Sequence, residues 1–206
     1  MKLRFLLLLF VFVLTTSFTS SSYNATKTSS IIENSEREDI ITLYEIFVNR
    51  NNTMPQLASF TKAVTGYLKL KSQGKIENET LTIIDFSLSS KAKRLWVLDM
   101  TSFKVLFNTV VAHGRNTGGE FATKFSNKNN SNQSSLGFYI TDNTYYGKNG
   151  LSLFLNGQEK GINDNASKEE MLALYQSVLL DELKIGKLLL FKHNNKNWRE
   201  EIAIGI

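Results

Sequence analysis

The sequence predicts a single α+β domain that is mostly β, with a helical hairpin before the strands and a C-terminal amphipathic helix. Three observations support this class. Apolar residues recur at helical spacing between residues 40 and 68, short runs rich in β-branched and aromatic residues follow from residue 81, and helical spacing returns after residue 166. The chain has 206 residues, with 42% hydrophobic and 21% charged residues, so it is long enough and apolar enough to bury one core.

The first residues have the pattern of an export signal. Lys2 and Arg4 precede an unbroken apolar run, residues 5–14, and small residues follow it. As a helix this run rises about 15 Å, half of the roughly 30 Å hydrocarbon core of a bilayer. We therefore expect residues 1–22 to be a signal peptide, no stable membrane span after its cleavage, and an exported protein of the periplasm or cell envelope. An uncleaved anchor is the alternative. Residues 23–34, rich in Ser and Thr, are predicted to be a disordered tether.

Residues 35–74 are predicted to form the helical hairpin. Its first helix begins at the capping box of Ser35 and ends at the Asn-rich stretch 49–52. Its second helix begins at Thr53, with a proline in the first turn, and ends at Gly74. Two short amphipathic helices need another surface to cover their apolar stripes, which the strands that follow can provide.

Residues 81–193 are predicted to form the β-domain. Six segments have the composition and length of strands: 81–86, 95–100, 105–112, 136–141, 151–156 and 187–193. A long polar loop, residues 114–135, separates the third from the fourth, and loops of this length are usually functional. The segment 167–183 begins with a third capping box and is predicted to be the amphipathic helix.

The composition excludes several kinds of site. Cysteine is absent, which removes disulfides, thiolate metal ligands and a cysteine nucleophile. Only two histidines, His113 and His193, are present, and no cofactor-binding motif occurs, so we expect neither a metal site nor a cofactor. The net charge of +5 comes from 24 basic and 19 acidic residues without a long basic block, so we expect no nucleic-acid partner. The oligomeric state remains open.

Four residues are candidates for contact with a substrate. His113 ends an apolar strand, where an imidazole could orient a ligand, and Ser135 could place its hydroxyl over a groove. Tyr139 and Tyr146 could offer flat rings with polar tips to a sugar or a peptide. The alternatives are a structural role for the histidine and core or rim positions for the tyrosines.

Several segments in a fixed order are more specific than any single residue. They are Leu81-Thr-Ile-Ile-Asp-Phe-Ser, Arg94-Leu-Trp-Val-Leu-Asp, Leu106-Phe-Asn-Thr-Val-Val-Ala-His-Gly-Arg-Asn-Thr-Gly, Lys124-Phe-Ser-Asn, Ser131-Asn-Gln-Ser-Ser-Leu-Gly-Phe-Tyr, Thr144-Tyr-Tyr-Gly-Lys-Asn-Gly-Leu-Ser-Leu and Gly161-Ile-Asn-Asp-Asn-Ala. In this order they resemble the murein L,D-transpeptidase catalytic-domain family of exported bacterial proteins, over about residues 43–166. The resemblance implies a mostly-β catalytic fold that acts on the stem peptides of peptidoglycan.

The resemblance also implies a reaction that this sequence lacks the residues to perform. The family's nucleophile is a cysteine in a Gly-Cys-Pro segment, activated by a histidine in an upstream His-Gly-Ala segment, and it forms a thioacyl enzyme. Both segments should follow Asn165-Ala166, and neither is present, so the β-domain is incomplete. His113 belongs to the earlier Val-Ala-His-Gly motif, and no catalytic residue is assigned. Leu188-Leu-Leu-Phe loosely resembles the family's closing strand.

Three hypotheses follow. The leading one is an exported L,D-transpeptidase-like protein that associates with peptidoglycan and lacks cysteine-dependent transpeptidation. In this pseudoenzyme His113, Ser135, Tyr139 and Tyr146 line the retained substrate groove. The second is a serine-dependent acyl hydrolase or transferase in which His113 activates Ser135. The third is the non-functional product of a truncated or frameshifted transpeptidase gene, since an internal deletion and a frameshift both fit the missing segments.

Overall fold

The computed structural model describes residues 21–147, 150–165, 172–173 and 189–193. It divides into two units, residues 1–39 and 40–206, and each is described by itself. The described part of the first unit is helical, because helix α2 spans Ser21–Arg50. The tether expected at 23–34 is thus helix, in a stretch without Gly or Pro, where extending an existing helix needs no new nucleus. The predicted signal peptide lies outside the described residues except for its last two.

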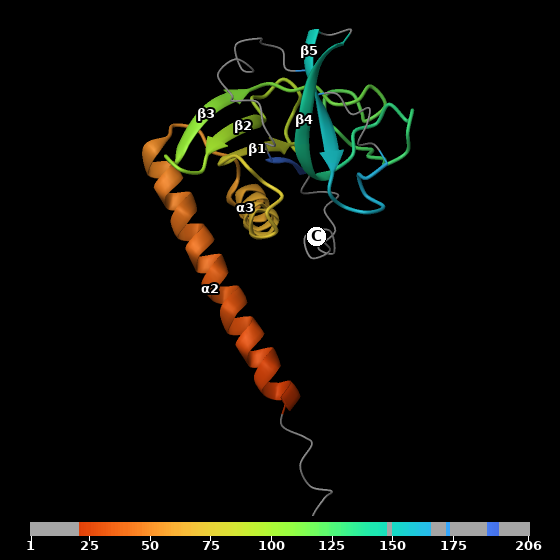
Figure 1. Ribbon diagram of the computed structural model, residues 1–206. Coiled ribbons are helices and arrows are strands. Elements are labelled where there is room, and N and C mark those ends of the chain that lie inside the picture. The colour runs from red at the N-terminus through yellow and green to blue at the C-terminus, as the bar shows by residue number, and fades with distance from the viewer. Residues whose placement is uncertain (1–20, 148–149, 166–171, 174–188, 194–206) are drawn as a thin grey trace, which may run out of the picture. The chain divides into compact units, whose positions relative to one another are not determined.

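The second unit is built on a mixed sheet (Figure 1). The strands are β1 (Thr80–Asp85), β2 (Leu95–Asp99), β3 (Lys104–Thr109), β4 (Gly137–Gly147), β5 (Gly150–Gly157), β6 (Leu172–Ala173) and β7 (Leu189–His193). Within the described part of the chain their order in the sheet is β3-β2-β1-β7-β4-β5-β6. Strand β7 runs parallel to β1 and antiparallel to β4, so it joins the two halves of the sheet.

The α+β class is confirmed, and each predicted strand segment overlaps an observed strand. Strand β3 ends at Thr109, however, so residues 110–112 and His113 lie in the loop after it and His113 does not end a strand. The six segments correspond to β1 to β5 and β7, and β4 continues beyond the predicted end to Gly147. The segment 167–183 differs from the expectation at Leu172–Ala173, which form β6 instead of part of a helix. These two residues pair with Ser152 and Leu153 of β5, so the edge of the sheet supplies their ladder partners. The remainder of that predicted helix lies outside the described residues.

The two helices of the predicted hairpin are present, but each begins at a different residue from the one predicted. Helix α2 begins at Ser21 and continues through the predicted cap at Ser35, and the second helix does not begin at Thr53. Helix α3 spans Leu57–Ser72, and its N-cap residue is Gln56 without a capping side chain, so Thr53 does not cap it. The end at Gly74 is confirmed: its φ is 68°, and its N–H donates to the Lys71 carbonyl at 2.9 Å. The Lys75 N–H donates to the Leu70 carbonyl at 3.0 Å, which completes a Schellman motif.

The Asn-rich turn after α2 closes an edge of the sheet. The Asn51 amide donates to the carbonyls of Phe47 at 2.8 Å and Phe103 at 3.1 Å. Its side-chain oxygen accepts the Val105 N–H at 2.8 Å. Since β3 is an edge strand, this asparagine satisfies backbone groups that would otherwise be open to pairing with another chain.

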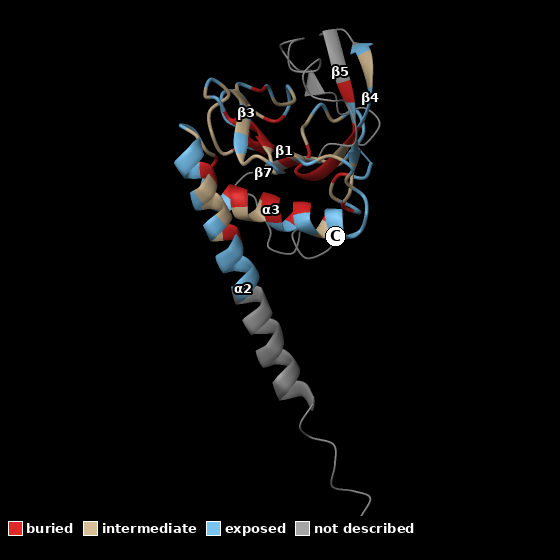
Figure 2. Cartoon of the chain, turned by 60° about the vertical axis from the view of Figure 1, so that its left-hand side comes forward, coloured by how far each residue is buried: buried red, intermediate tan, exposed pale blue. Residues whose placement is uncertain are grey.

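Both faces of the sheet are covered. One face, called the helix-covered face here, packs against α3 and against residues 40–50; Figure 2 shows the buried side of α3 turned toward the strands. The other, the loop-covered face, packs against residues that include Val111, Ala122 and Leu136. Successive strand residues alternate between the two cores, so Phe138 lies on the helix-covered face and Tyr139 on the loop-covered face.

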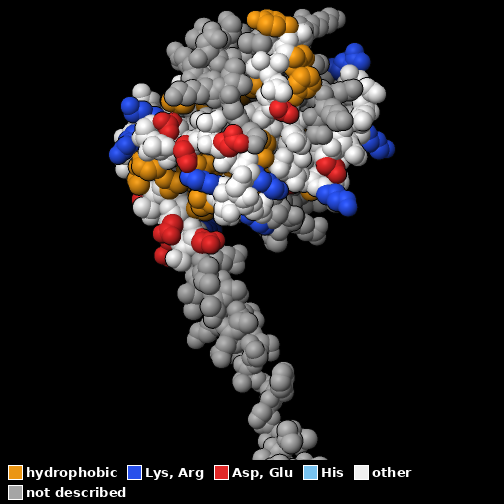
Figure 3. Space-filling model, viewed as in Figure 1, with side chains coloured by type: hydrophobic (Ala, Val, Ile, Leu, Met, Phe, Trp, Pro, Cys, Tyr) orange, Lys and Arg blue, Asp and Glu red, His pale blue; other side chains and the backbone are white. Residues whose placement is uncertain are grey.

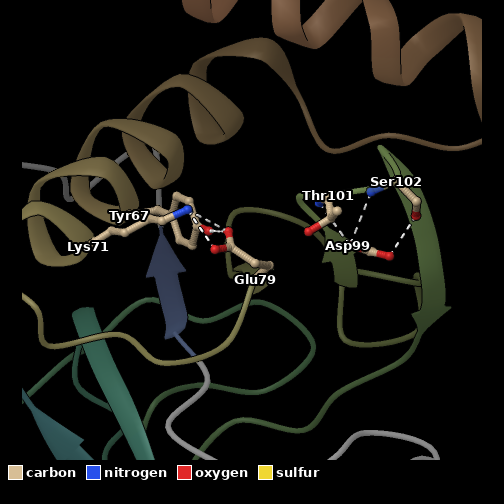
Figure 4. Close-up of polar contacts among 6 residues, drawn as sticks. All are labelled: Tyr67, Lys71, Glu79, Asp99, Thr101 and Ser102. Atoms are coloured by element: carbon tan, nitrogen blue, oxygen red, sulfur yellow. Dashed lines mark hydrogen bonds and ion pairs between the residues drawn. The ribbon is translucent and has the colours of Figure 1, made fainter.

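Polar side chains anchor the helix-covered face at one end (Figure 4). The Tyr67 hydroxyl of α3 donates to the Glu79 carboxylate, and the Lys71 ammonium lies 2.7 Å from both Glu79 oxygens. Burial, together with the bond to Glu79, raises the pKa of Tyr67. Asp99, at the end of β2, accepts the Thr101 N–H at 2.9 Å and the Ser102 hydroxyl at 2.6 Å, and so closes the turn to β3.

Candidate functional site

Segments that are far apart in the sequence meet on the loop-covered face. We call residues 110–136 together with 157–165 the loop cluster. The Asn116 N–H donates to the Asn132 carbonyl at 2.9 Å, which folds the long polar loop back on itself. Asn127 joins the two parts, because its amide donates to the Asp164 carboxylate at 2.9 Å and its side-chain oxygen accepts the Asn165 N–H at 3.0 Å.

Thr117 is the centre of the long loop. It is fully buried, its carbonyl accepts the N–H groups of Thr123 and Lys124 at 2.9 Å each, and its hydroxyl accepts the Ser134 N–H at 2.7 Å. The Ser134 hydroxyl in turn accepts the Gly114 N–H at 3.0 Å. A Cβ at Gly114 would lie 2.6 Å from the Asn132 carbonyl oxygen, so the two limbs of the loop approach too closely for another residue.

The side chain of Arg94 binds the backbone at the start of the long loop. Its guanidinium is fully buried and donates to the Val111 carbonyl at 2.9 and 3.1 Å and to the Leu88 carbonyl at 2.9 Å. The guanidinium carbon also lies 5.0 Å from the centre of the Phe86 ring. Burial lowers the pKa of Arg94 to about 10, against the opposing effect of the Asp85 charge. Each of these contacts satisfies a backbone group or a charge inside the protein, which is a structural role.

The hydrogen bonds of His113 determine the state of its ring. Arg94 can only donate, so its contact of 2.8 Å with Nδ1 makes that nitrogen an acceptor. The proton is then on Nε2, which donates to the Gly118 carbonyl at 3.2 Å. Both ring nitrogens are therefore engaged, and neither is free to take a proton from a serine hydroxyl.

Two of the four candidate contact residues lie in the interior. Ser135 is 1% exposed and Tyr139 is 0% exposed, and their hydroxyls are hydrogen-bonded to each other. Tyr139 therefore lies in the core. A core position was the alternative to contact with a ligand in the sequence analysis. The physical reason is the alternation of β4, which directs this ring beneath the loop cluster, while Phe138 stacks on Phe191 on the opposite face.

Tyr146 is the candidate that remains accessible. It is 85% exposed, near the end of the hairpin formed by β4 and β5. Beside it in the sequence, the ring of Tyr145 stacks on Phe154 of β5 with centroids 4.3 Å apart. His113 and Ser135 thus belong to the loop cluster, whereas Tyr146 belongs to the hairpin.

The loop cluster contains a buried acid that the sequence patterns did not indicate. Glu159 is 4% exposed, and its Oε2 accepts the Phe138 N–H at 2.6 Å and the Asn163 amide at 3.1 Å. The Asn163 side-chain oxygen accepts the Glu159 N–H at 2.9 Å. Burial raises the pKa of Glu159 to about 7, although the two hydrogen bonds act in the opposite direction. We call this pair the Glu159–Asn163 clasp.

Two glycines are the sequence signal that could have indicated the clasp. A Cβ at Gly137, whose φ is 103°, would overlap the Glu159 carboxylate. A Cβ at Gly157 would overlap the Asn163 backbone carbonyl. Glycines flanking a strand show that something approaches the backbone closely, but they do not show that the approaching group is an acid.

The charges around the site are mixed. Within the described ranges, no group of three or more His, Asp or Glu residues is placed to hold a metal ion. On the face drawn in Figure 3, the described Lys and Arg side chains are interspersed with Asp and Glu.

No helix in the described part of the chain is both long enough and apolar enough to cross a bilayer.

Comparison with known proteins identifies one family. The family model of the L,D-transpeptidase catalytic domain matches residues 51–177, a range that contains α3, the strands β1 to β6 and the whole loop cluster. No curated protein sequence and no solved structure matches the chain.

Proposed function

Because the chain belongs to the L,D-transpeptidase catalytic domain family, we propose that it is an exported cell-envelope protein that binds peptidoglycan stem peptides without thiol-dependent transpeptidation. The observation that carries the proposal is the loop cluster. Its motif segments are folded on one another by specific hydrogen bonds, while the 206-residue sequence contains no cysteine. Binding a ligand needs only the folded motif segments, whereas thioacyl chemistry needs a thiolate.

The bonding of the serines argues against replacement of the missing thiol by a hydroxyl. A serine nucleophile requires a base within hydrogen-bond reach. The Ser135 hydroxyl is buried against Tyr139, the Ser134 hydroxyl accepts a backbone N–H, and both nitrogens of His113 are engaged. These contacts support a binding role over the serine-dependent alternative.

The position of β7 bears on the third hypothesis, a broken gene product. Phe191 of β7 is fully buried and stacks on Phe138 with centroids 4.4 Å apart. Strand β7 also supplies the ladder partners of both β1 and β4. An arbitrary out-of-frame tail would not be expected to provide an apolar central strand in register, so this strand supports loss of an internal segment with the closing strand retained.

An exposed cation in the loop cluster suits the proposed ligand. Arg115 is exposed and follows directly after His113 and Gly114, whose ring and N–H are hydrogen-bonded to Gly118 and Ser134 of the loop cluster. Stem peptides carry carboxylates, and a guanidinium binds a carboxylate through two parallel N–H groups. Arg115 and Tyr146 are therefore the side chains assigned to the ligand.

Co-sedimentation with purified sacculi tests the proposal. We expect the purified chain to pellet with sacculi, and Arg115→Ala and Tyr146→Ala each to weaken binding severalfold. Lys93→Ala is the matched control for the charge, since Lys93 is also exposed but lies outside the loop cluster. A chain that stays in the supernatant at every sacculus concentration would contradict the proposal, and so would equal losses in Arg115→Ala and Lys93→Ala.

A second assay addresses the absence of thiol chemistry. Stem-peptide dimers and free amino-acid exchange products are measured by mass spectrometry after incubation of the chain with tetrapeptide. We expect neither product. Turnover that disappears in Ser135→Ala would overturn the pseudoenzyme assignment and favour the serine-dependent enzyme.

A further inference from the structure

The Glu159–Asn163 clasp joins the turn after β5 to the start of β4. Strand β4 contributes the Phe138 N–H to Glu159 Oε2. The Asn163 amide donates to the Phe138 carbonyl of β4 and to the carbonyl of Leu136, the residue before β4, at 3.1 Å each. The Gln158 N–H also donates to the Phe138 carbonyl at 3.0 Å. The turn 157–165 is thus held on β4 mainly through one carboxyl group and one carboxamide.

The two oxygens of the Glu159 carboxyl have very different surroundings. Oε2 accepts two N–H groups, whereas Oε1 is buried and has no hydrogen-bond partner among the described residues. A buried neutral carboxyl with one unpaired oxygen is tolerable, but a buried carboxylate without a cation or further donors is strongly unfavourable. The geometry therefore accommodates the protonated acid better than its anion.

Among the side chains that the structure describes, no charged group compensates for an ionised Glu159. Lys160 is exposed, and Asp164 is exposed and bonded to the Asn127 amide and the Gly161 N–H. Lys192 of β7 is opposite Gly137 in the strand register. Neither ion pair found among the described residues includes Glu159.

We propose that the Glu159–Asn163 clasp is a pH-operated device, which holds the turn 157–165 on β4 while the carboxyl is protonated and releases the turn when the carboxyl ionises. Release of the turn also affects the rest of the loop cluster. Asp164 and Asn165, at the end of this turn, are the partners of Asn127 in the long loop. Opening the clasp therefore breaks the bond of the Asn163 amide to the Leu136 carbonyl and frees the segment that carries the partners of Asn127.

The direction of the pH effect follows from linkage. The carboxyl has an ordinary pKa of 4.5 in the open form and a pKa of about 7 in the closed form, so the closed form keeps its proton over a range in which the open form loses it. The clasp is fully stable below pH 4.5 and loses stability as the pH rises toward 7. For this difference we expect the opening equilibrium constant to rise roughly 100-fold between pH 5 and pH 8.5.

Hydrogen exchange of the full chain tests the proposal. Protection factors, corrected for the intrinsic exchange rate at each pH, are measured for the amides of Phe138, Gln158 and Glu159. In the wild type we expect the protection factors of these amides to fall by up to roughly 100-fold between pH 5 and pH 8.5. In Glu159→Gln, a neutral side chain of nearly the same shape, we expect protection that no longer depends on pH.

Glu45→Gln is the matched control, because Glu45 is an exposed carboxylate on α2 and the chemical change is the same. It should keep the pH dependence of the wild type. Protection in the wild type that does not change between pH 5 and pH 8.5 would overturn the proposal, and so would an equal fall in Glu159→Gln.

A measurement on the unmodified protein covers the case in which Glu159→Gln does not fold. The side-chain carboxyl carbon of Glu159 is followed by NMR during a pH titration, and we expect a midpoint near 7. A midpoint near the ordinary 4.5 would overturn the proposal. Because neither experiment uses sacculi, failure of the clasp and failure of peptidoglycan binding remain distinguishable.

Discussion

The helix-covered face and the loop-covered face of the sheet are stabilised in different ways. On the helix-covered face, α3 and the end of α2 contribute rings and aliphatic side chains, and Phe60 packs edge-on against both Tyr44 and Phe47. On the loop-covered face, the buried side chains include Arg94, Glu159 and Asn163, which bond mainly to backbone groups.

The difference follows from what covers each face. A helix satisfies its own backbone N–H and C=O groups, so it can present a mostly apolar stripe to a sheet, although α3 also buries the Ser59 hydroxyl, which donates to Asp85 at 3.1 Å. An irregular loop does not, and its buried backbone groups need side-chain partners. Buried polar residues on the loop-covered face are therefore what allows a long loop to be folded and held there.

The largest effect is expected for a cavity on the helix-covered face. Phe60→Ala removes a fully buried ring and should lower the free energy of unfolding by about 4 kcal/mol. Urea unfolding measures this loss. Leu68→Ala is the control on the same helix, because Leu68 is 50% exposed and should change stability by less than about 1 kcal/mol. Similar losses in the two variants would contradict the packing described for α3.

Removal of the buried guanidinium should cost somewhat less and act on a different face. Arg94→Met leaves the carbonyls of Val111 and Leu88 without these donors, and we expect a loss of about 3 kcal/mol in unfolding free energy. Nδ1 of His113 also loses its donor, so the imidazole nitrogen shifts in NMR should show a mixture of tautomers. An unchanged single tautomer would show that Arg94 does not determine the state of the ring.

A smaller effect is expected for the buried hydroxyl pair. Ser135→Ala removes a partner of the Tyr139 hydroxyl, which should lower the free energy of unfolding by about 1 kcal/mol. Tyr139→Phe in the same background should add less than it does alone, because the two hydroxyls interact directly. Additive losses in this double-mutant cycle would indicate that the pair contributes nothing as a pair.

The smallest effect is expected for the exposed ion pair beside α3. Bonds to Lys71 and then to Tyr67 lower the pKa of Glu79, so its contribution is present above the ordinary 4.5 and disappears as the pH falls through the lowered value. Glu79→Gln should therefore lower the free energy of unfolding by less than about 1 kcal/mol at pH 7. As the pH falls, the urea midpoints of the wild type and the variant should converge. A difference that does not shrink with falling pH would assign the effect to packing instead of charge.

The sequence by itself determined the elements and the family. Six strand segments, two helices and the glycine stop at Gly74 follow from local patterns, because period and turn chemistry act over a few residues. The ordered motifs likewise predicted the L,D-transpeptidase family, which the family match over residues 51–177 confirms. The absence of cysteine from these 206 residues is also a property of the sequence alone.

Only the tertiary structure decided which polar residues face inward. Tyr139 and Ser135 have the composition of groove contacts but lie in the core, and Glu159 has the composition of a surface turn but is buried. It also decided that Leu172–Ala173 form a strand instead of a helix, through pairing with β5. The physical reason is that each depends on a segment distant in the sequence. Ser135 and Tyr139 are buried beneath the loop cluster, Glu159 binds the N–H of Phe138, and Leu172–Ala173 pair with β5, none of which a local pattern encodes.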